Sequence, residues 1–121
     1  MRATIAIGDQ TVEMASNGAI DIIYRQVFHE DAVKLQYEMA DDDVAGMLNC
    51  MIRMGFVMAK AAEISSAREL MQLTEDDFVD WLMQFDRAEY VGALPQIRDV
   101  YEGQRITTSD AKKNQDQQTD Q

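Results

Sequence analysis

Residues 43–63 read DVAGMLNCMIRMGFVMAKAAE, and this stretch decides the fold class. Apolar side chains recur in it at helical spacing, and additional apolar residues widen the stripe until little of the helix is polar. We therefore predict a long helix that is buried centrally, or covered partly by a second copy of the protein. Gly55 and Ala59 are small enough to let another helix approach closely.

The N-terminal residues alternate in the manner of β-strands. Ala3, Ile5 and Ile7 fall on one face of a first strand, and residues 11–15 resume the pattern after a turn at residues 8–10. The pattern predicts a β-hairpin. An isolated two-stranded hairpin is marginal in water, so we expect it to pack on helices or to pair with another chain.

Helical spacing begins after the hairpin. Ser16 and Asn17 are good helix caps, and apolar residues then recur every three or four positions to about Phe28. His29 is expected to end this helix, and a second helical stretch reaches Met39.

The last third of the chain carries further helix signals. A short helix is predicted over residues 67–73. Thr74 is expected to cap the next helix, with Asp77 three residues later completing a capping-box pattern. Pro95 suits the first position of a final short helix, which Gly103 would end.

Length and composition predict a single domain. The chain has 121 residues, and 46% of them are apolar, as in a globular protein. We predict an α+β fold, with a mainly helical body and an N-terminal β-hairpin over residues 1–103. Polar residues dominate 104–121, which we predict to be a flexible tail, disordered in isolation.

The charge limits the classes of partner. The net charge is −11, and a body this acidic repels both phosphate backbones and anionic lipid surfaces. We therefore expect neutral or basic protein as the partner, and neither nucleic acid nor membrane. One cysteine allows no internal disulfide and fits a reducing compartment. We expect no transmembrane helix and no secretory signal.

Few residues offer catalytic or metal-binding chemistry. Cys50 lies in the long apolar helix and is expected to be a small buried hydrophobe, while His29 is the single histidine. Zinc would need four suitable ligands, and the acidic clusters at 41–43 and 75–77 are interpreted as helix-start charges. We therefore predict a protein that is not an enzyme and has no catalytic residues, no cofactor and no metal.

Two sets of apolar side chains are candidates for partner binding. Each has two interpretations, as plain core or as part of a binding surface, because methionine and aromatic side chains serve both purposes. The candidates are Met47, Met51, Met54 and Met58 in the long helix, and Phe78, Trp81 and Phe85 further along.

The order of segments resembles a known family. A hairpin is followed by Tyr24-Arg25-Gln26-Val27-Phe28, a long Met- and Ala-rich helix, and the segment DFVDWLMQF at residues 77–85. This arrangement resembles the tail assembly chaperones of long-tailed bacteriophages and related prophages, chiefly those of Gram-positive hosts. The resemblance covers about residues 1–100 and depends on the order and spacing of two short, non-catalytic motifs.

The resemblance implies a role in virus assembly. Members of this family act in the host cytoplasm, where they bind the tape measure protein and keep it soluble while tail tube subunits assemble, and they are not part of the mature virion. Many are also made in a longer, frameshifted form that recruits the major tail tube protein. Lys112-Lys113 is compatible with a slippery A-rich codon run, which the DNA sequence would test. The resemblance assigns no contact residue.

Other interpretations remain open. The charge also suits an acidic DNA mimic, or another small phage regulatory protein that binds proteins, although the acids cluster at helix starts and do not line one face. A small hydrolase or metal enzyme, and a structural subunit of the mature tail, are further alternatives. Homo-oligomerisation is also predicted, because the long helix has more apolar surface than a small body covers.

Overall fold

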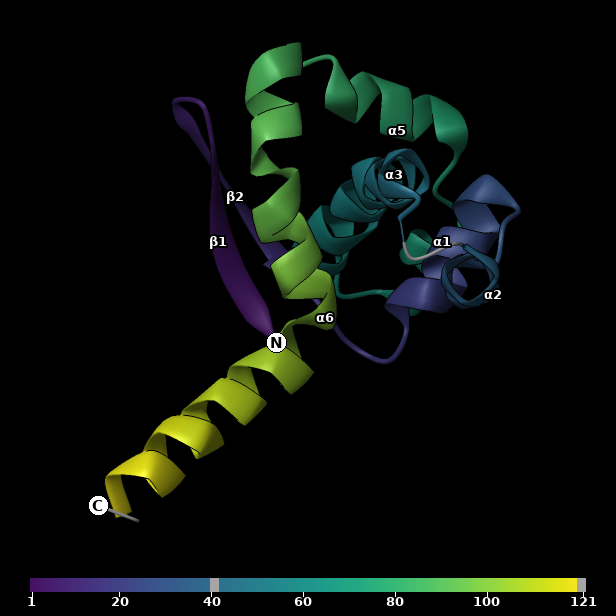
Figure 1. Cartoon of the computed structure of the whole chain (residues 1–121). Helices are drawn as coiled ribbons and strands as arrows, with labels where there is room; N and C mark the ends of the chain where they lie inside the picture. The colour runs from purple at the N-terminus through teal and green to yellow at the C-terminus, as the bar shows by residue number, and fades with distance from the viewer. Residues whose placement is uncertain (40–41, 120–121) are drawn as a thin grey trace.

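A computed structural model describes the backbone of residues 1–39 and 42–119, and the side chains of residues 1–39 and 42–103. The fold is a mainly helical body with an N-terminal antiparallel hairpin, as the sequence predicted (Figure 1). In the described parts of the chain the elements are β1 (Arg2–Ile7), β2 (Gln10–Ala15), α1 (Ile20–Phe28), α2 (Ala32–Glu38), α3 (Val44–Glu63), α4 (Ala67–Leu70), α5 (Glu75–Leu82) and α6 (Arg87–Thr119).

The hairpin forms as predicted, with a turn one residue shorter than the expected residues 8–10. Ile5 pairs with Val12, and Ile7 pairs with Gln10 across a two-residue turn. Gly8 in that turn has a φ of 61°, a left-handed conformation that glycine adopts without steric cost. The apolar face of the hairpin is buried against the helices, which meets the need of a two-stranded sheet for a packing partner.

Helix α3 is the centre of the fold, as its apolar sequence predicted. It contacts β2, α6, α1 and α5. Figure 1 shows α3 nearly end-on, with the hairpin and α6 on one side, α5 above, and α1 with α2 on the other side. The predicted close approach occurs at Gly55, which faces Tyr90 and Ile97 of α6. The Tyr90 hydroxyl donates a hydrogen bond to the Ile52 carbonyl at 2.7 Å.

Acidic and hydroxyl side chains cap the N-termini of α3 and α5 at the positions that the sequence predicted. The Asp43 carboxylate accepts from the Gly46 N–H at 2.9 Å and caps α3. Thr74 and Asp77 form a reciprocal capping box at the start of α5. For the described residues Asp43 and Asp77 these contacts confirm the interpretation as helix-start charges, since carboxylates stabilise the positive end of the helix dipole, whereas Asp41 lies outside the described residues.

Two predicted helix boundaries are wrong. Helix α1 begins at Ile20 without a side-chain cap, because the Ser16 hydroxyl bonds the Tyr101 carbonyl and Asn17 bonds the Ala19 N–H. The last helix begins at Arg87, well before Pro95. Its start signal is Asp86, whose carboxylate accepts from the Glu89 N–H at 3.1 Å.

The last helix also continues past its predicted end at Gly103. Its backbone is helical to Thr119, and Figure 1 shows this final part projecting away from the body. The flexibility that we predicted for residues 104–121 in isolation stays a prediction, and so does the division into a body of residues 1–103 and a tail.

Candidate functional site

The predicted methionine set divides along α3. Met54 and Met58 are completely buried, and Met51 is nearly so, because the second half of α3 is covered on several sides. Met47 is only half-buried, in the first turns of the helix. The plain-core interpretation therefore describes Met54 and Met58, whereas Met47 and Met51 line a surface groove.

The predicted aromatic set closes the core at the other end of α3. Trp81 is buried, and its ring centroid lies 5.8 Å from that of Phe56 on α3. Phe78 lies 5.5 Å from Phe56, and Phe85 lies 4.9 Å from Trp81. These edge-to-face contacts hold α5 against the body, so this set contributes first to packing.

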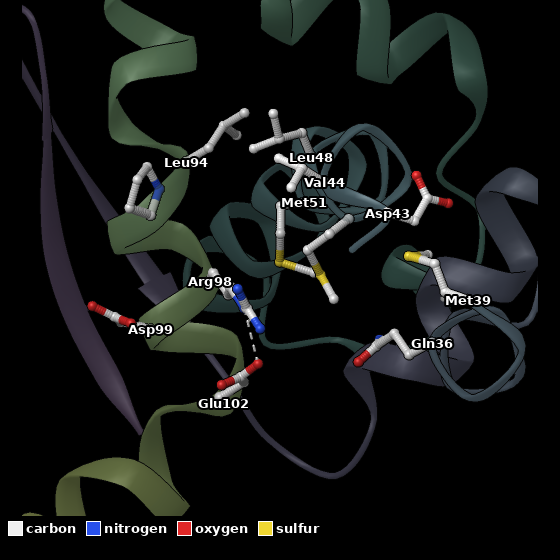
Figure 2. Close-up of a pocket in the computed structure, with 12 residues that line it drawn as sticks. Gln36, Met39, Asp43, Val44, Leu48, Met51, Leu94, Arg98, Asp99 and Glu102 are labelled. Atoms are coloured by element: carbon white, nitrogen blue, oxygen red, sulfur yellow. Dashed lines mark hydrogen bonds and ion pairs between the residues drawn. The ribbon is translucent and has the colours of Figure 1, made fainter. Parts of the chain in front are cut away.

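A groove with a volume of about 430 Å³ lies between α2, α3 and α6 (Figure 2). This volume lies in the range of small ligand pockets. Its lining combines apolar side chains from α3, from α6 and from Met39 just after α2 with charged side chains, mainly from α6. The lining residues are Gln36, Met39, Asp43, Val44, Met47, Leu48, Met51, Leu94, Pro95, Arg98, Asp99 and Glu102.

The groove exists because the first turns of α3 are incompletely covered. Val44 is 66% exposed, and Met47 and Leu48 are half-buried, although the same helix is fully buried ten residues later. Figure 2 shows Leu48 and Leu94 pointing toward one another from α3 and α6. Uncovered apolar side chains that converge from separate elements are a feature of protein-binding surfaces.

The groove has an apolar end and a charged end. On α6, Leu94 and Pro95 are followed one turn later by Arg98 and Asp99, and then by Glu102. Arg98 Nε lies 3.1 Å from Glu102 Oε1, so one carboxylate is already paired. Asp43 lies on the opposite wall, where its carboxylate caps α3, and Figure 2 shows the Asp99 carboxylate pointing away from the groove.

A polar cluster lies beside the groove, around Cys50. The Tyr24 hydroxyl donates to Glu30 Oε1 at 3.2 Å, and Arg53 pairs with the same oxygen at 2.5 Å. Burial raises the pKa of the Cys50 thiol and that of the Tyr24 phenol. Both groups are therefore protonated at neutral pH, and a protonated thiol is a weak nucleophile.

Cys50 and His29 do not form a reactive pair. Cys50 is buried, as predicted, and faces a hollow between α1, α2 and α3. His29 ends α1 in a left-handed conformation, is exposed, and lines a different hollow with residues 71–76. Within residues 1–39 and 42–103, no group of three or more histidine, cysteine or carboxylate side chains is arranged to hold a metal ion.

Helix α3 also meets a membrane-span criterion. An 18-residue window of this 20-residue helix has a mean hydropathy of 1.2, so by length and composition alone the helix is apolar enough to cross a membrane. The core helix of a soluble protein passes the same test, and here the second half of α3 packs inside the body. The burial of α3 supports the core-helix interpretation.

Sequence reasoning named two of the seven apolar residues that line the groove, Met47 and Met51, but not the groove itself. Leu94 was missed because it comes from a distant segment, α6. Comparisons with protein-family models, with curated proteins and with solved structures give no match to this chain.

Proposed function

We propose that this chain is a non-catalytic tail assembly chaperone of a bacteriophage or prophage, which binds the tape measure protein and keeps it soluble during tail morphogenesis. The observation that carries the proposal is the groove, where the first turns of the most apolar helix are left uncovered between α2 and α6. The resemblance of residues 1–100 to that family supplies the identity of the client.

The groove suits a helical client. An amphipathic helix presents side chains at i, i+3, i+4 and i+7, and it docks by laying this stripe into an apolar groove. Met39, Met47 and Met51 are unbranched and polarizable, so they adjust to clients of different shape. The net charge of −11 would keep a complex with an apolar client in solution.

The two motifs that resemble the chaperone family lie in the core of the fold. Tyr24 and Phe28 of the first motif are buried under α3, and Trp81 of the second lies against Phe56. Both motifs therefore build the body that holds α3 in place, and neither lines the groove. The motifs support kinship in fold, and the groove supports the binding role.

The role implies a place and a time of action. In this proposal the chain works in the host cytoplasm, is absent from the finished virion, and needs no cofactor. A longer, frameshifted form would bring the tail tube protein to the client-bound chaperone.

Co-expression tests the proposal. The tape measure protein, which the proposal places in a gene just downstream, would be expressed alone, with this chain, and with its Met47→Gln variant. We expect the downstream protein to become soluble and to co-purify with the natural chain, and to do so less with the variant. Met83→Gln is the matched control, because Met83 is 76% exposed and lies outside the groove.

The same experiment separates the rival functions. A downstream protein that stays equally insoluble in all samples, with nothing co-purifying, would refute the chaperone proposal. Binding to a nucleic-acid-binding protein that disappears in high salt would support the acidic DNA mimic, because apolar client binding survives screening.

A further inference from the structure

Helix α2 packs loosely on the body. Among residues 31–39 the one fully buried side chain is Ala32, and α1 is the helix against which α2 packs most closely. The Gln36 amide donates a hydrogen bond to the Tyr101 hydroxyl at 3.0 Å, which joins α2 to α6. A helix of seven residues is not stable alone, and a segment with few buried apolar side chains opens locally at low cost.

Two hollows separate α2 from the first half of α3. The groove in Figure 2 lies between α2, α3 and α6, and a second hollow of about 430 Å³ lies between α1, α2 and α3. Met39 and Asp43 line both. The α3 residues of the groove are Val44, Met47, Leu48 and Met51, and those of the second hollow are Gly46, Asn49, Cys50 and Arg53. Helix α2 therefore divides one continuous stretch of α3, residues 44–53, into two hollows.

The α2 segment presents the side-chain pattern of a docked helix. Within residues 31–39 the least exposed side chains are spaced at i, i+3, i+4 and i+7, and they are Ala32, Leu35, Gln36 and Met39. An amphipathic helix docks in a groove by such a stripe. Alanine is small and glutamine is polar, and the hollows beside α2 stay open. Helix α2 therefore occupies the seat of a helix without filling it.

We propose that α2 is a lid that swings away from α3 and joins the two hollows into one groove, where a helical segment of the client takes its place. The joined groove spans residues 44–53 of α3, which corresponds to roughly 15 Å along the helix axis. The chain turns sharply between α1 and α2 at His29, whose φ is 57°. The identity of the occupant rests on the proposed function and deepens it, whereas the opening of α2 is independent of that function.

Cys50 reports the opening of α2 directly. It is the single cysteine of the chain, is 2% exposed, and lines the hollow beneath α2. Its reaction with a thiol-specific chromogenic reagent would be followed in the full chain, from no urea up to the start of global unfolding. We expect a labelling rate that hardly changes over this range, because a local opening exposes little surface and responds weakly to urea. A rate that rises as steeply as global unfolding would overturn the lid.

Gln36→Gly should hold the lid open more often. The substitution removes the bond to Tyr101 and places glycine inside α2, so the labelling of Cys50 should be about tenfold faster. Asp80→Gly is the matched control, because it places glycine at an exposed position of α5 outside both hollows. Circular dichroism would confirm the fold of both variants. Equal labelling rates in Gln36→Gly and the natural chain would overturn the proposal.

A competition experiment tests the occupant. The natural chain and Gln36→Gly would compete for a limiting amount of the tape measure protein, and Asp80→Gly would replace Gln36→Gly in the control. A covered site binds more weakly in proportion to the fraction of time for which it is open. The Gln36→Gly variant should therefore capture up to about tenfold more client than the natural chain. Equal capture would overturn the displacement of α2 by the client.

The outcomes are separable from those of the proposed function. Equal capture by the two proteins keeps the chaperone role and refutes α2 as the gate of its site. A tape measure protein that binds neither protein refutes the chaperone role and with it the client as the occupant, while the labelling of Cys50 still decides whether α2 opens. Sedimentation that reveals a dimer of Gln36→Gly would assign the uncovered face of α3 to a second copy and overturn the client as its occupant.

Discussion

Gly55→Ala tests the close approach of α3 and α6. A Cβ atom at this position would overlap the Tyr90 hydroxyl oxygen, and it would lie 3.3 Å from Ile97 Cδ1. The Tyr90 ring cannot swing away freely, because it stacks on Phe85 at 5.6 Å and meets the edge of Trp81 at 5.7 Å. The hydroxyl must therefore shift and lose its bond to the Ile52 carbonyl.

The magnitude follows from three contributions. Alanine is about 1 kcal/mol better than glycine inside a helix. Losing the buried hydrogen bond costs roughly 1 kcal/mol, which offsets that gain. Overpacking a well-filled core costs roughly 1–3 kcal/mol, so the net loss of unfolding free energy is about 2 kcal/mol. For a chain of this size that loss lowers the Tm by about 8 °C.

A double-mutant cycle with Tyr90→Phe isolates the cause. Without the hydroxyl, the nearest ring atom is Cζ at 3.5 Å from the new Cβ, which is ordinary contact. In the Tyr90→Phe background Gly55→Ala should then keep the helix gain of about 1 kcal/mol, less the cost of the 3.3 Å contact with Ile97, so the coupling energy is about 2–3 kcal/mol. Urea and thermal unfolding, monitored by circular dichroism, would measure all four proteins. An equal loss in both backgrounds would refute the argument from the hydroxyl.

Three further predictions concern stability and reactivity. Thr74→Ala should lower the unfolding free energy by about 1 kcal/mol, because the capping box of α5 is lost, whereas Thr74→Ser should retain most of it in urea titrations. Burial raises the pKa of Tyr90, so its contribution to stability is fully present below pH of about 10 and is lost as the pH rises further. Urea midpoints between pH 8 and 11 should therefore fall less steeply in Tyr90→Phe, and identical slopes would contradict this assignment. Cys50 should react with a thiol-specific chromogenic reagent far more slowly in the folded chain than in urea, and equal rates would show that the thiol is accessible.

Local signals in the sequence predicted most elements of the fold. The hairpin followed from the alternation around Gly8, and the starts of α3 and α5 followed from Asp43 and Thr74, because caps and turns act over a few residues. The same local logic failed at Pro95. The sequence around a proline does not distinguish the first position of a helix from its interior, and Pro95 lies inside α6. The start signal of α6 is the capping carboxylate of Asp86, which the prediction did not use.

The groove could be predicted only in part, for a different reason. The apolar stripe of α3 identified Met47 and Met54 equally, and nothing local distinguishes the half-buried side chain from the fully buried one. That difference depends on how far β2, α1, α5 and α6 extend along α3. The contribution of Leu94 likewise depends on tertiary packing, since it is 47 positions from Met47 in the sequence.

One helix forms both the floor of the groove and the centre of the core, so occupancy and folding are thermodynamically linked. An occupant at one hundred times its Kd would add about 2.7 kcal/mol to the unfolding free energy. It would also suppress openings that begin at the uncovered first turns of α3 and spread along the helix. Amide hydrogen exchange at Phe56, which is completely buried, would therefore slow when a client settles on Val44 and Met47 at the surface.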